Sequence, residues 1–117
     1  MGFTRSYTSE EPTRAVVDAL PGPSVLEFGT PWCGHCSAAK PLIETAFAGH
    51  PDVRHLKVED GPGLPLGRSF RIKLWPTLVF LRDGREIGRL VRPADTGSIA
   101  QQLQLAERGG RDTAAPE

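Results

Sequence analysis

The chain has 117 residues, which is the length of one typical domain and leaves no room for a second. Its 14 basic and 14 acidic residues cancel, so the net charge gives no reason to expect nucleic acid as a partner. The first residues carry no secretory signal, and no apolar stretch approaches the roughly 18 residues that span a membrane, so we expect a soluble, cytosolic protein.

The first predicted element is a helix in the segment "PTRAVVDAL". Thr8 and Glu11 have the spacing of a capping box ahead of it, and the "PGP" of residues 21–23 ends it. One stripe of this helix is apolar, and we expect it to be buried: Ala15, Val16, Ala19 and Leu20.

A short strand and a long helix follow. The segment "SVLEF", residues 24–28, is β-prone and lies between chain-breaking residues, which predicts a buried strand. From Cys33 onward the apolar residues recur at helical spacing, and Gly49 and Pro51 are stop signals. Pro41 lies inside this helix, where a proline costs about 3 kcal/mol, so we expect a kink there.

The segment "VRHLKV" alternates in polarity as a strand does. Leu56 and Val58 alternate with His55 and Lys57, which predicts one protected face and one face in solvent. Residues 66–72, in a stretch rich in Gly and Pro, are compatible with a short helix.

The strongest hairpin signal is the Asp83-Gly84 turn between "TLVFL" and "REIGRLV". After it, a helix is predicted from Thr96 to Glu107, with Gly109 as its stop signal. The apolar stripe of this last helix consists of Ile99, Leu103 and Ala106.

Strands that alternate with helices and end in a hairpin predict an α/β protein. Parallel pairing through helical crossovers and an antiparallel hairpin together give a central mixed β-sheet flanked by helices on both faces. We expect one domain over residues 1–107 and a disordered tail over residues 108–117, which has little apolar content to bury.

The two cysteines of the chain lie together at the predicted turn from strand to helix. Cys33 and Cys36 are one helical turn apart, so their sulfurs can form a disulfide or lie side by side as thiols. At a helix start, free N–H groups and the helix dipole favour the thiolate of Cys33, which is the form that attacks a disulfide. Gly34 leaves the approach open, and protonated His35 would lower the pKa of the Cys33 thiol.

Two other interpretations of the cysteine pair remain open. A metal site usually needs four ligands, and the three histidines of the chain are not at zinc-finger spacing, so no metal is expected. The pair could also be inert core residues, although structural disulfides are rare in the cytosol and a close pair there is more often catalytic. His35 could be an ordinary solvated loop residue.

The segment "EFGTPWCGHCSAAKP" resembles the active-site segment of the thioredoxin superfamily, and its "PWCGHC" is most similar to the protein disulfide isomerase version. Pro41 is similar to the proline that kinks the active-site helix of this family. The stretch "WPTLVFLRDGREIGRL" resembles the family segment that begins with a cis-proline and continues through a hairpin. The resemblance covers most of residues 25–90 and implies a thioredoxin fold.

The resemblance also implies a substrate surface around the cysteines. Pro76 aligns with the cis-proline, which packs against the disulfide and leaves a backbone edge free for substrate; the alternative is a surface proline at the start of a strand. Trp32, Gly34 and Thr77 would line the same surface. Trp75 is bulkier than the usual family residue, so it would narrow the groove, offer a stacking surface, or belong to the core.

Glu27 lies six residues before Cys33 in an otherwise apolar strand. A buried, unpaired carboxylate is costly, and the resemblance implies a buried acid here that helps to deprotonate Cys36. Alternatively, Glu27 points to water from a half-exposed strand. His55 occupies the position where thioredoxins usually have a lysine near this acid, so the proton path would titrate differently.

The sequence therefore predicts a thiol-disulfide oxidoreductase that uses Cys33 as nucleophile and Cys36 as resolving cysteine, with Glu27 and His35 assisting. No cofactor is required, because the cysteines carry the electrons. We expect a monomer that reduces protein disulfides and takes electrons from a reductase or glutathione, with no membrane partner. The alternatives are a thioredoxin-fold binding module whose dithiol is not turned over, and an exported oxidase or isomerase.

Overall fold

The computed structural model describes residues 2–109 of the chain. Most of the predicted tail, residues 110–117, and residue 1 lie outside this range. None of the described helices is long and apolar enough to cross a bilayer. In chain order the elements are α1 (Arg14–Asp18), β1 (Pro23–Gly29), α2 (Gly34–Ala48), β2 (Arg54–Glu59), α3 (Pro65–Ser69), β3 (Thr77–Arg82), β4 (Arg85–Val91) and α4 (Thr96–Glu107).

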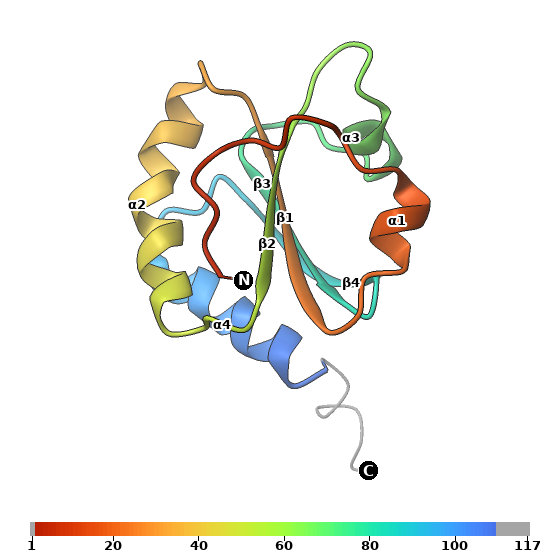
Figure 1. Cartoon of the computed structure of the whole chain (residues 1–117). Coiled ribbons are helices and arrows are strands. Elements are labelled where there is room, and N and C mark those ends of the chain that lie inside the picture. The colour runs from red at the N-terminus through yellow and green to blue at the C-terminus, as the bar shows by residue number, and fades with distance from the viewer. Residues whose placement is uncertain (1, 110–117) are drawn as a thin grey trace.

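The strands form one mixed four-stranded sheet in the order β2-β1-β3-β4. β1 pairs in parallel with β2 and antiparallel with β3, and β4 pairs antiparallel with β3 as the second arm of the hairpin. Figure 1 shows the sheet between α2 and α4 on one side and α1 and α3 on the other. The predicted α/β architecture, a mixed sheet with helices on both faces, is confirmed.

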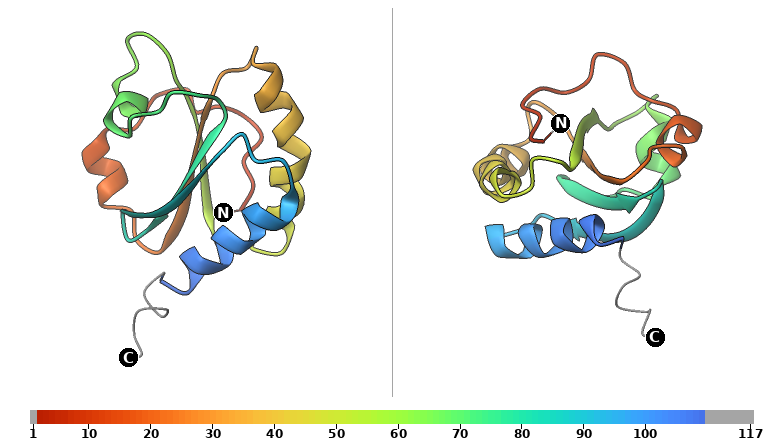
Figure 2. Two further views of the ribbon diagram at one scale, coloured as in Figure 1. Left: turned by 180° about the vertical axis from the view of Figure 1, so that it is seen from behind. Right: turned by 60° about the horizontal axis from the view of Figure 1, so that its bottom comes forward.

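Two apolar cores lie on the two faces of this sheet. Figure 2 shows the ribbon of the sheet and its covering helices from behind and from below. The core under α2 and α4 includes Val25, Ile43, Phe47, Leu78, Phe80, Ile99 and Leu103. The core under α1 and α3 includes Val17, Leu26, Phe28, Leu66, Phe70, Val79 and Leu81. Neighbouring residues of β1 and β3 therefore serve opposite cores, as the alternation of side chains along a strand requires.

The hairpin and the last helix form where the sequence places them. Asp83 and Gly84 both have positive φ, 52° and 79°, which is the left-handed backbone of a two-residue hairpin turn. α4 has the predicted bounds, and the carboxylate of Asp95 caps it by accepting the N–H of Ser98 at 2.7 Å. Its predicted stripe is buried, and Gly109 follows the helix with φ of 86°.

The predicted capping box of the first helix is wrong. Thr13, not Thr8, caps α1, and its hydroxyl accepts the N–H of Val16 at 3.1 Å. Glu11 instead accepts the N–H of Leu66 at 3.2 Å, in the first turn of α3. α1 is only five residues long, and Val17 is its buried residue, whereas of the predicted stripe only Leu20 packs partly against the core.

The alternation in β2 predicted that one face of the strand is exposed to solvent, and this prediction is wrong. His55 and Lys57 are buried, because the N-terminal segment of the chain lies along this edge of the sheet. The ring of Phe3 stacks on His55, and the N–H of Thr8 donates to the carbonyl of Lys57 at 2.9 Å. His55 and Lys57 can be buried on this face because the N-terminal segment that covers it supplies hydrogen-bond partners for their polar atoms.

The predicted short helix exists but is shifted. α3 begins at Pro65, which fits the first helical position because a proline lacks the N–H that is unpaired there. It ends at Ser69, and Arg71 with φ of 59° takes the chain out of the helix before the predicted end at residue 72. α2 continues through Pro41 to Ala48, and the predicted kink stays a prediction.

Candidate functional site

Cys33 and Cys36 lie at the start of α2, as predicted. Cys33 is the N-cap, and its Sγ accepts the backbone N–H of Cys36 at 3.2 Å. Both are free thiols, and both are mostly buried, at 8% and 4% exposed. The Cys33 sulfur therefore occupies the place of a capping oxygen, where unpaired N–H groups stabilise negative charge.

The two thiols differ in acidity. Burial acts to raise the pKa of the Cys33 thiol, but hydrogen bonds from the Cys36 thiol and from the N–H groups of Cys36 and His35, together with the charge of Arg92, outweigh burial and hold this pKa below its ordinary value. Burial raises the pKa of the Cys36 thiol to about 11, and its hydrogen bond to Cys33 adds to the effect. One sulfur ionises readily, and the other retains its proton.

Arg92 is part of this site although the sequence analysis did not identify it. Its backbone has φ of 50°, which is unusual for a residue with a side chain. Its N–H donates to the carbonyl of Pro76 at 2.9 Å, and its Nε donates to the carbonyl of Trp75 at 2.8 Å. These contacts fix a cation beside the cysteines. No sequence pattern indicates it, because it follows β4 and is far from Cys33 in the chain.

The loop before β3 lies beside the cysteines. The Trp75-Pro76 peptide bond is cis, which confirms the expected geometry of Pro76. Trp75 is half-buried and meets the exposed Trp32 edge to face, with 5.6 Å between the ring centroids. Its Nε1 donates to Asp60 at 2.9 Å, another residue that the sequence analysis missed. Trp75 is thus a wall of the site and not a core residue.

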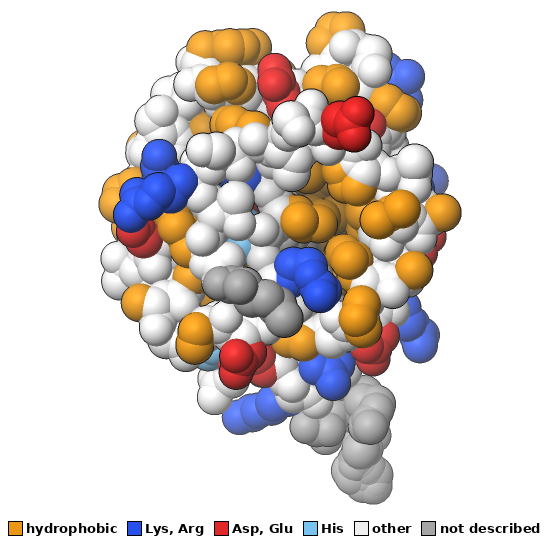
Figure 3. All heavy atoms as spheres, in the orientation of Figure 1, with side chains coloured by type: hydrophobic (Ala, Val, Ile, Leu, Met, Phe, Trp, Pro, Cys, Tyr) orange, Lys and Arg blue, Asp and Glu red, His pale blue; other side chains and the backbone are white. Residues whose placement is uncertain are grey.

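The surface near the cysteines is partly apolar. Trp32 is 75% exposed, and Leu74 and Val91 are about half exposed. In Figure 3 hydrophobic side chains lie at the upper edge of the molecule, above the start of α2, and others gather on the right over α1 and α3, with charges of both signs around them. Such an apolar rim suits contact with another polypeptide chain. Thr77, in contrast, is buried, and its hydroxyl donates to the carbonyl of Leu74 at 2.7 Å.

Glu27 is buried, as predicted, and it has a partner. Its Oε1 lies 2.9 Å from Nε2 of His55, and both side chains are removed from solvent. Nδ1 of His55 accepts the backbone N–H of Thr4 at 2.8 Å, so the ring proton is on Nε2 and points to Glu27. The partner is therefore His55, at the position where the resemblance implied a change from lysine.

Gly34 and His35 are exposed in the first turn of α2. The His35 ring makes no hydrogen bond or ion pair with another residue in the described part of the chain, and it is the backbone N–H of His35 that lowers the pKa of the Cys33 thiol. The predicted influence of the imidazole on Cys33 stays a prediction.

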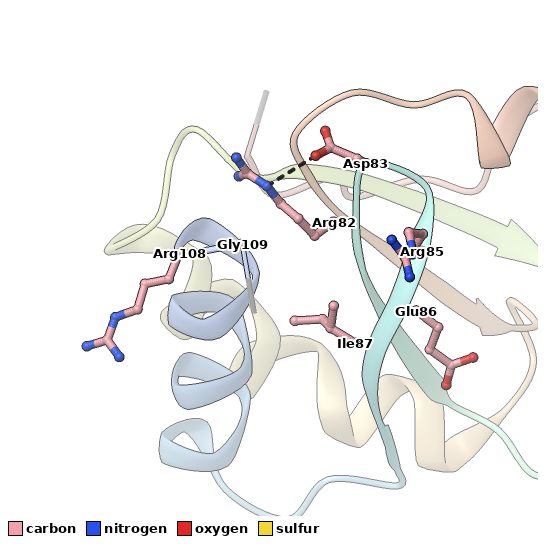
Figure 4. A pocket seen from close by; sticks show the side chains of 7 residues that line it. All are labelled: Arg82, Asp83, Arg85, Glu86, Ile87, Arg108 and Gly109. Carbon is pink, nitrogen blue, oxygen red and sulfur yellow. Dashed lines mark ion pairs between the residues drawn. The ribbon is translucent and has the colours of Figure 1, made fainter. Parts of the chain in front are cut away.

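A second hollow of the described surface is lined by other kinds of residue and contains no cysteine. A cavity of about 500 Å³ lies at the opposite end of the sheet, between the hairpin turn and the end of α4. Figure 4 shows that charged side chains line it, with Arg82 and Asp83 forming an ion pair of 3.7 Å. Within residues 2–109, no three His, Cys, Asp or Glu side chains are grouped so that they could hold a metal ion.

Comparison with known proteins identifies the family and the fold of this chain. The family model for thioredoxin matches residues 5–105. The structure of reduced thioredoxin 2 from Pseudomonas aeruginosa PAO1 is similar, with a TM-score of 0.81 and 52% identity over 92% of this chain and 100% of that one. The arrangement of sheet and helices in this chain is therefore the thioredoxin fold, as predicted.

Two relatives show how widely the similarity extends. The chain is 30% identical to thioredoxin H2-1 from Oryza sativa subsp. japonica over 77% of its length and 64% of that protein. It is 42% identical to protein disulfide-isomerase A2 from Pongo abelii over 68% of its length and 16% of that protein. The chain thus spans less than two thirds of each of these relatives.

Proposed function

Because this chain belongs to the thioredoxin family, whose members are thiol-disulfide oxidoreductases that act on protein disulfides, we propose that it exchanges its Cys33-Cys36 dithiol with protein disulfides. The observation that carries the proposal is the difference between the two thiols. Cys33 caps a helix and has a lowered pKa, whereas Cys36 is buried behind it with a raised pKa. A nucleophile that ionises first and a second thiol held in reserve are what a two-step exchange requires.

In the first step the Cys33 thiolate attacks one sulfur of the substrate disulfide. A bond forms between Cys33 and that sulfur, the substrate S–S bond breaks, and the other substrate sulfur leaves as a thiolate. In the second step Cys36 loses its proton to Glu27 and attacks the sulfur of Cys33. The Cys33-Cys36 disulfide forms, and the second substrate sulfur leaves. The dithiol has then given two electrons to the substrate.

The docking surface in this proposal is the rim around Cys33. Trp32 and Trp75 form its aromatic wall, and Pro76 closes it beside the thiols. The carbonyl of Trp75 already accepts Nε of Arg92, so a substrate backbone that pairs with this carbonyl must share it or displace the side chain. Gly34 leaves the approach to Cys33 open.

We propose net reduction in the cytosol, with electrons supplied by a reductase or by glutathione. The supply of electrons in that compartment favours reduction, and the potential of the site decides how readily the dithiol gives up its electrons. No cofactor takes part, because the Cys33-Cys36 dithiol itself supplies the two electrons and becomes a disulfide when it has given them up. The family resemblance to thioredoxins supports this direction, and the "CGHC" sequence, typical of disulfide isomerases, is the reason to measure it.

Reduction of insulin disulfides tests the activity. The wild-type protein with a dithiol as electron donor should precipitate insulin, and Cys33→Ser should not. Cys36→Ser should accumulate a mixed disulfide with insulin through Cys33, which mass spectrometry of the linked peptides identifies. If both variants keep the wild-type rate, or if no mixed disulfide forms, the chain is a binding module and not an oxidoreductase.

The redox midpoint tests the direction. Trp32 and Trp75 lie beside the cysteines, so their fluorescence reports the state of the dithiol in a series of glutathione buffers. A midpoint near about −270 mV, the value of thioredoxin, supports net reduction. A midpoint near about −180 mV, the value of protein disulfide isomerase, contradicts it and indicates oxidation or isomerisation.

A further inference from the structure

Behind Cys36 the structure contains a cavity with an unused hydroxyl group. The cavity measures about 310 Å³ and is lined by Tyr7, Thr30, Cys36 and Lys57 among others. The hydroxyl of Tyr7 is buried, yet it has no hydrogen-bond partner among the residues that the structure describes. Nearly all buried polar groups in proteins are paired, so an unpaired one beside a reactive sulfur requires an explanation.

The position of this hydroxyl depends on Gly29. A methyl group on Gly29 would lie 2.6 Å from Sγ of Cys36 and 3.0 Å from the hydroxyl oxygen of Tyr7. Both atoms therefore border the same small volume, which is empty only because residue 29 has no side chain. The resolving sulfur and the phenol face each other across it.

The ring of Tyr7 is held in place from the other side. The ammonium group of Lys57 lies 4.8 Å from the ring centroid and donates to the carbonyl of Arg5 at 3.2 Å. The next residue, Thr8, pairs through its N–H with the carbonyl of Lys57. These contacts tie the N-terminal segment to β2, so the hydroxyl approaches Cys36 without a large loss of freedom when a bond forms.

The groups around the phenol make it a donor. Burial raises the pKa of Tyr7, and the neighbouring Cys36 and Glu27 raise it further. The phenol therefore keeps its proton at the pH values where Cys33 and Cys36 react. The titratable groups that act on it are the two thiols and Glu27, and the cationic side chains that line the same cavity are Arg5, Lys40 and Lys57. Of these, the Cys36 sulfur becomes an anion during the second step, and an anion is the strongest acceptor available to a buried hydroxyl.

We propose that the hydroxyl of Tyr7 donates a hydrogen bond to the Cys36 sulfur when Cys36 is the attacking thiolate, and that this bond accelerates the resolving step. The proposal rests on the proposed exchange function. Tyr7 gives up no proton: the thiol proton of Cys36 leaves to Glu27, the Cys33-Cys36 bond forms, and the substrate departs from Cys33 as a thiolate. Tyr7 only stabilises the negative sulfur before it attacks.

A disulfide reagent that releases a coloured aromatic thiol separates the two steps. The first equivalent of colour appears when Cys33 attacks the reagent, and the second appears when Cys36 resolves the mixed disulfide. Tyr7→Phe keeps the ring and removes the hydroxyl. We expect a second phase slowed by about tenfold and a first phase changed less than twofold, because hydrogen bonds to charged groups are the strong ones.

Thr30→Val is the matched control, because it also removes a buried hydroxyl from the same cavity. It should change the second phase less than twofold. A second phase that is unchanged in Tyr7→Phe, or equally slow in Thr30→Val, overturns the proposal. Absence of the first phase in the wild-type protein would instead refute the exchange function itself, so the two failures are distinguishable.

A second measurement needs no variant. The chain has one tyrosine, so protein labelled with carbon-13 in the tyrosine ring gives a single signal for the carbon that bears the hydroxyl. We expect this signal to move as Cys36 of the reduced protein ionises, and to stay constant over the same pH range in Cys36→Ala. A signal that is constant in both proteins would refute the contact.

Discussion

The imidazole of His55 and the carboxylate of Glu27 form a hydrogen bond of 2.9 Å in which neither side chain is exposed. The N–H of Thr4 occupies the other ring nitrogen, so the imidazole donates to one oxygen of Glu27 and leaves the second free. That second oxygen, Oε2, has no partner among the described residues. Glu27 is therefore held in one orientation with a single oxygen available to accept a proton.

Replacement of Glu27 tests its role as proton acceptor. Glu27→Gln preserves an oxygen for the His55 bond but cannot take up a proton, so we expect the resolving step to slow by about tenfold or more. The attack of Cys33 should be unaffected. The measurement is the rate of the second colour phase between pH 6 and 9. Glu59→Gln, at the exposed end of β2, is the control. Unchanged rates over this range would remove Glu27 from the mechanism.

The acidity of the two thiols predicts the pH dependence of alkylation. The pKa of Cys33 is below its ordinary value of 9.0, so its thiolate persists as the pH falls below that value, and its reactivity is lost only when the pH passes below the lowered pKa. Cys36 should become reactive only near pH 11. Rates of iodoacetamide labelling, assigned by mass spectrometry, measure both.

Two results would test whether the pKa of the Cys33 thiol is lowered. In Cys36→Ala the Cys33 midpoint should rise, because the thiol that donates a hydrogen bond to Cys33 is missing. A Cys33 midpoint at or above its ordinary value of 9.0 in the wild-type protein would contradict the lowered pKa of Cys33.

The charge of Arg92 should tune Cys33 from the surface. Arg92→Gln removes the cation, so we expect the alkylation of Cys33 at neutral pH to slow by about twofold. High salt should abolish the difference between this variant and the wild type, because exposed charges are screened. Arg92→Lys should retain most of the effect. Arg85→Gln, at the hairpin end of β4, is the distant control and should match the wild type.

The close approach at Gly29 predicts that a methyl group there is harmful. Gly29→Ala would put a carbon 2.6 Å from Sγ of Cys36, so the helix start must shift. We expect a loss of about 1–3 kcal/mol in the free energy of unfolding, which is typical of overpacking, and slower resolution. Gly97→Ala is the control, because the nearest atom to its methyl group lies at 3.5 Å in an exposed turn of α4. If Gly29→Ala and the wild-type protein unfold at the same urea concentration, the steric argument is refuted.

Local signals determined much of this protein. The Asp83-Gly84 pair tolerates the left-handed backbone that a two-residue hairpin turn requires, and the spacing of Ile99, Leu103 and Ala106 places them on one face of a helix. The "CGHC" motif placed two sulfurs one turn apart at a helix start. Each of these features depends on residues close in the chain, so short-range geometry is sufficient to predict it.

Other features depended on segments that meet only in the folded chain. The sequence contains no sign that Thr4 completes the bond between His55 and Glu27, that Arg92 reaches Trp75, or that Tyr7 faces Cys36. The alternation in β2 was misleading for the same reason: it reports which residues share a face, but not what covers that face. Sequence patterns thus placed the dithiol, while packing of the N-terminal segment and the end of β4 decided which groups surround its sulfurs.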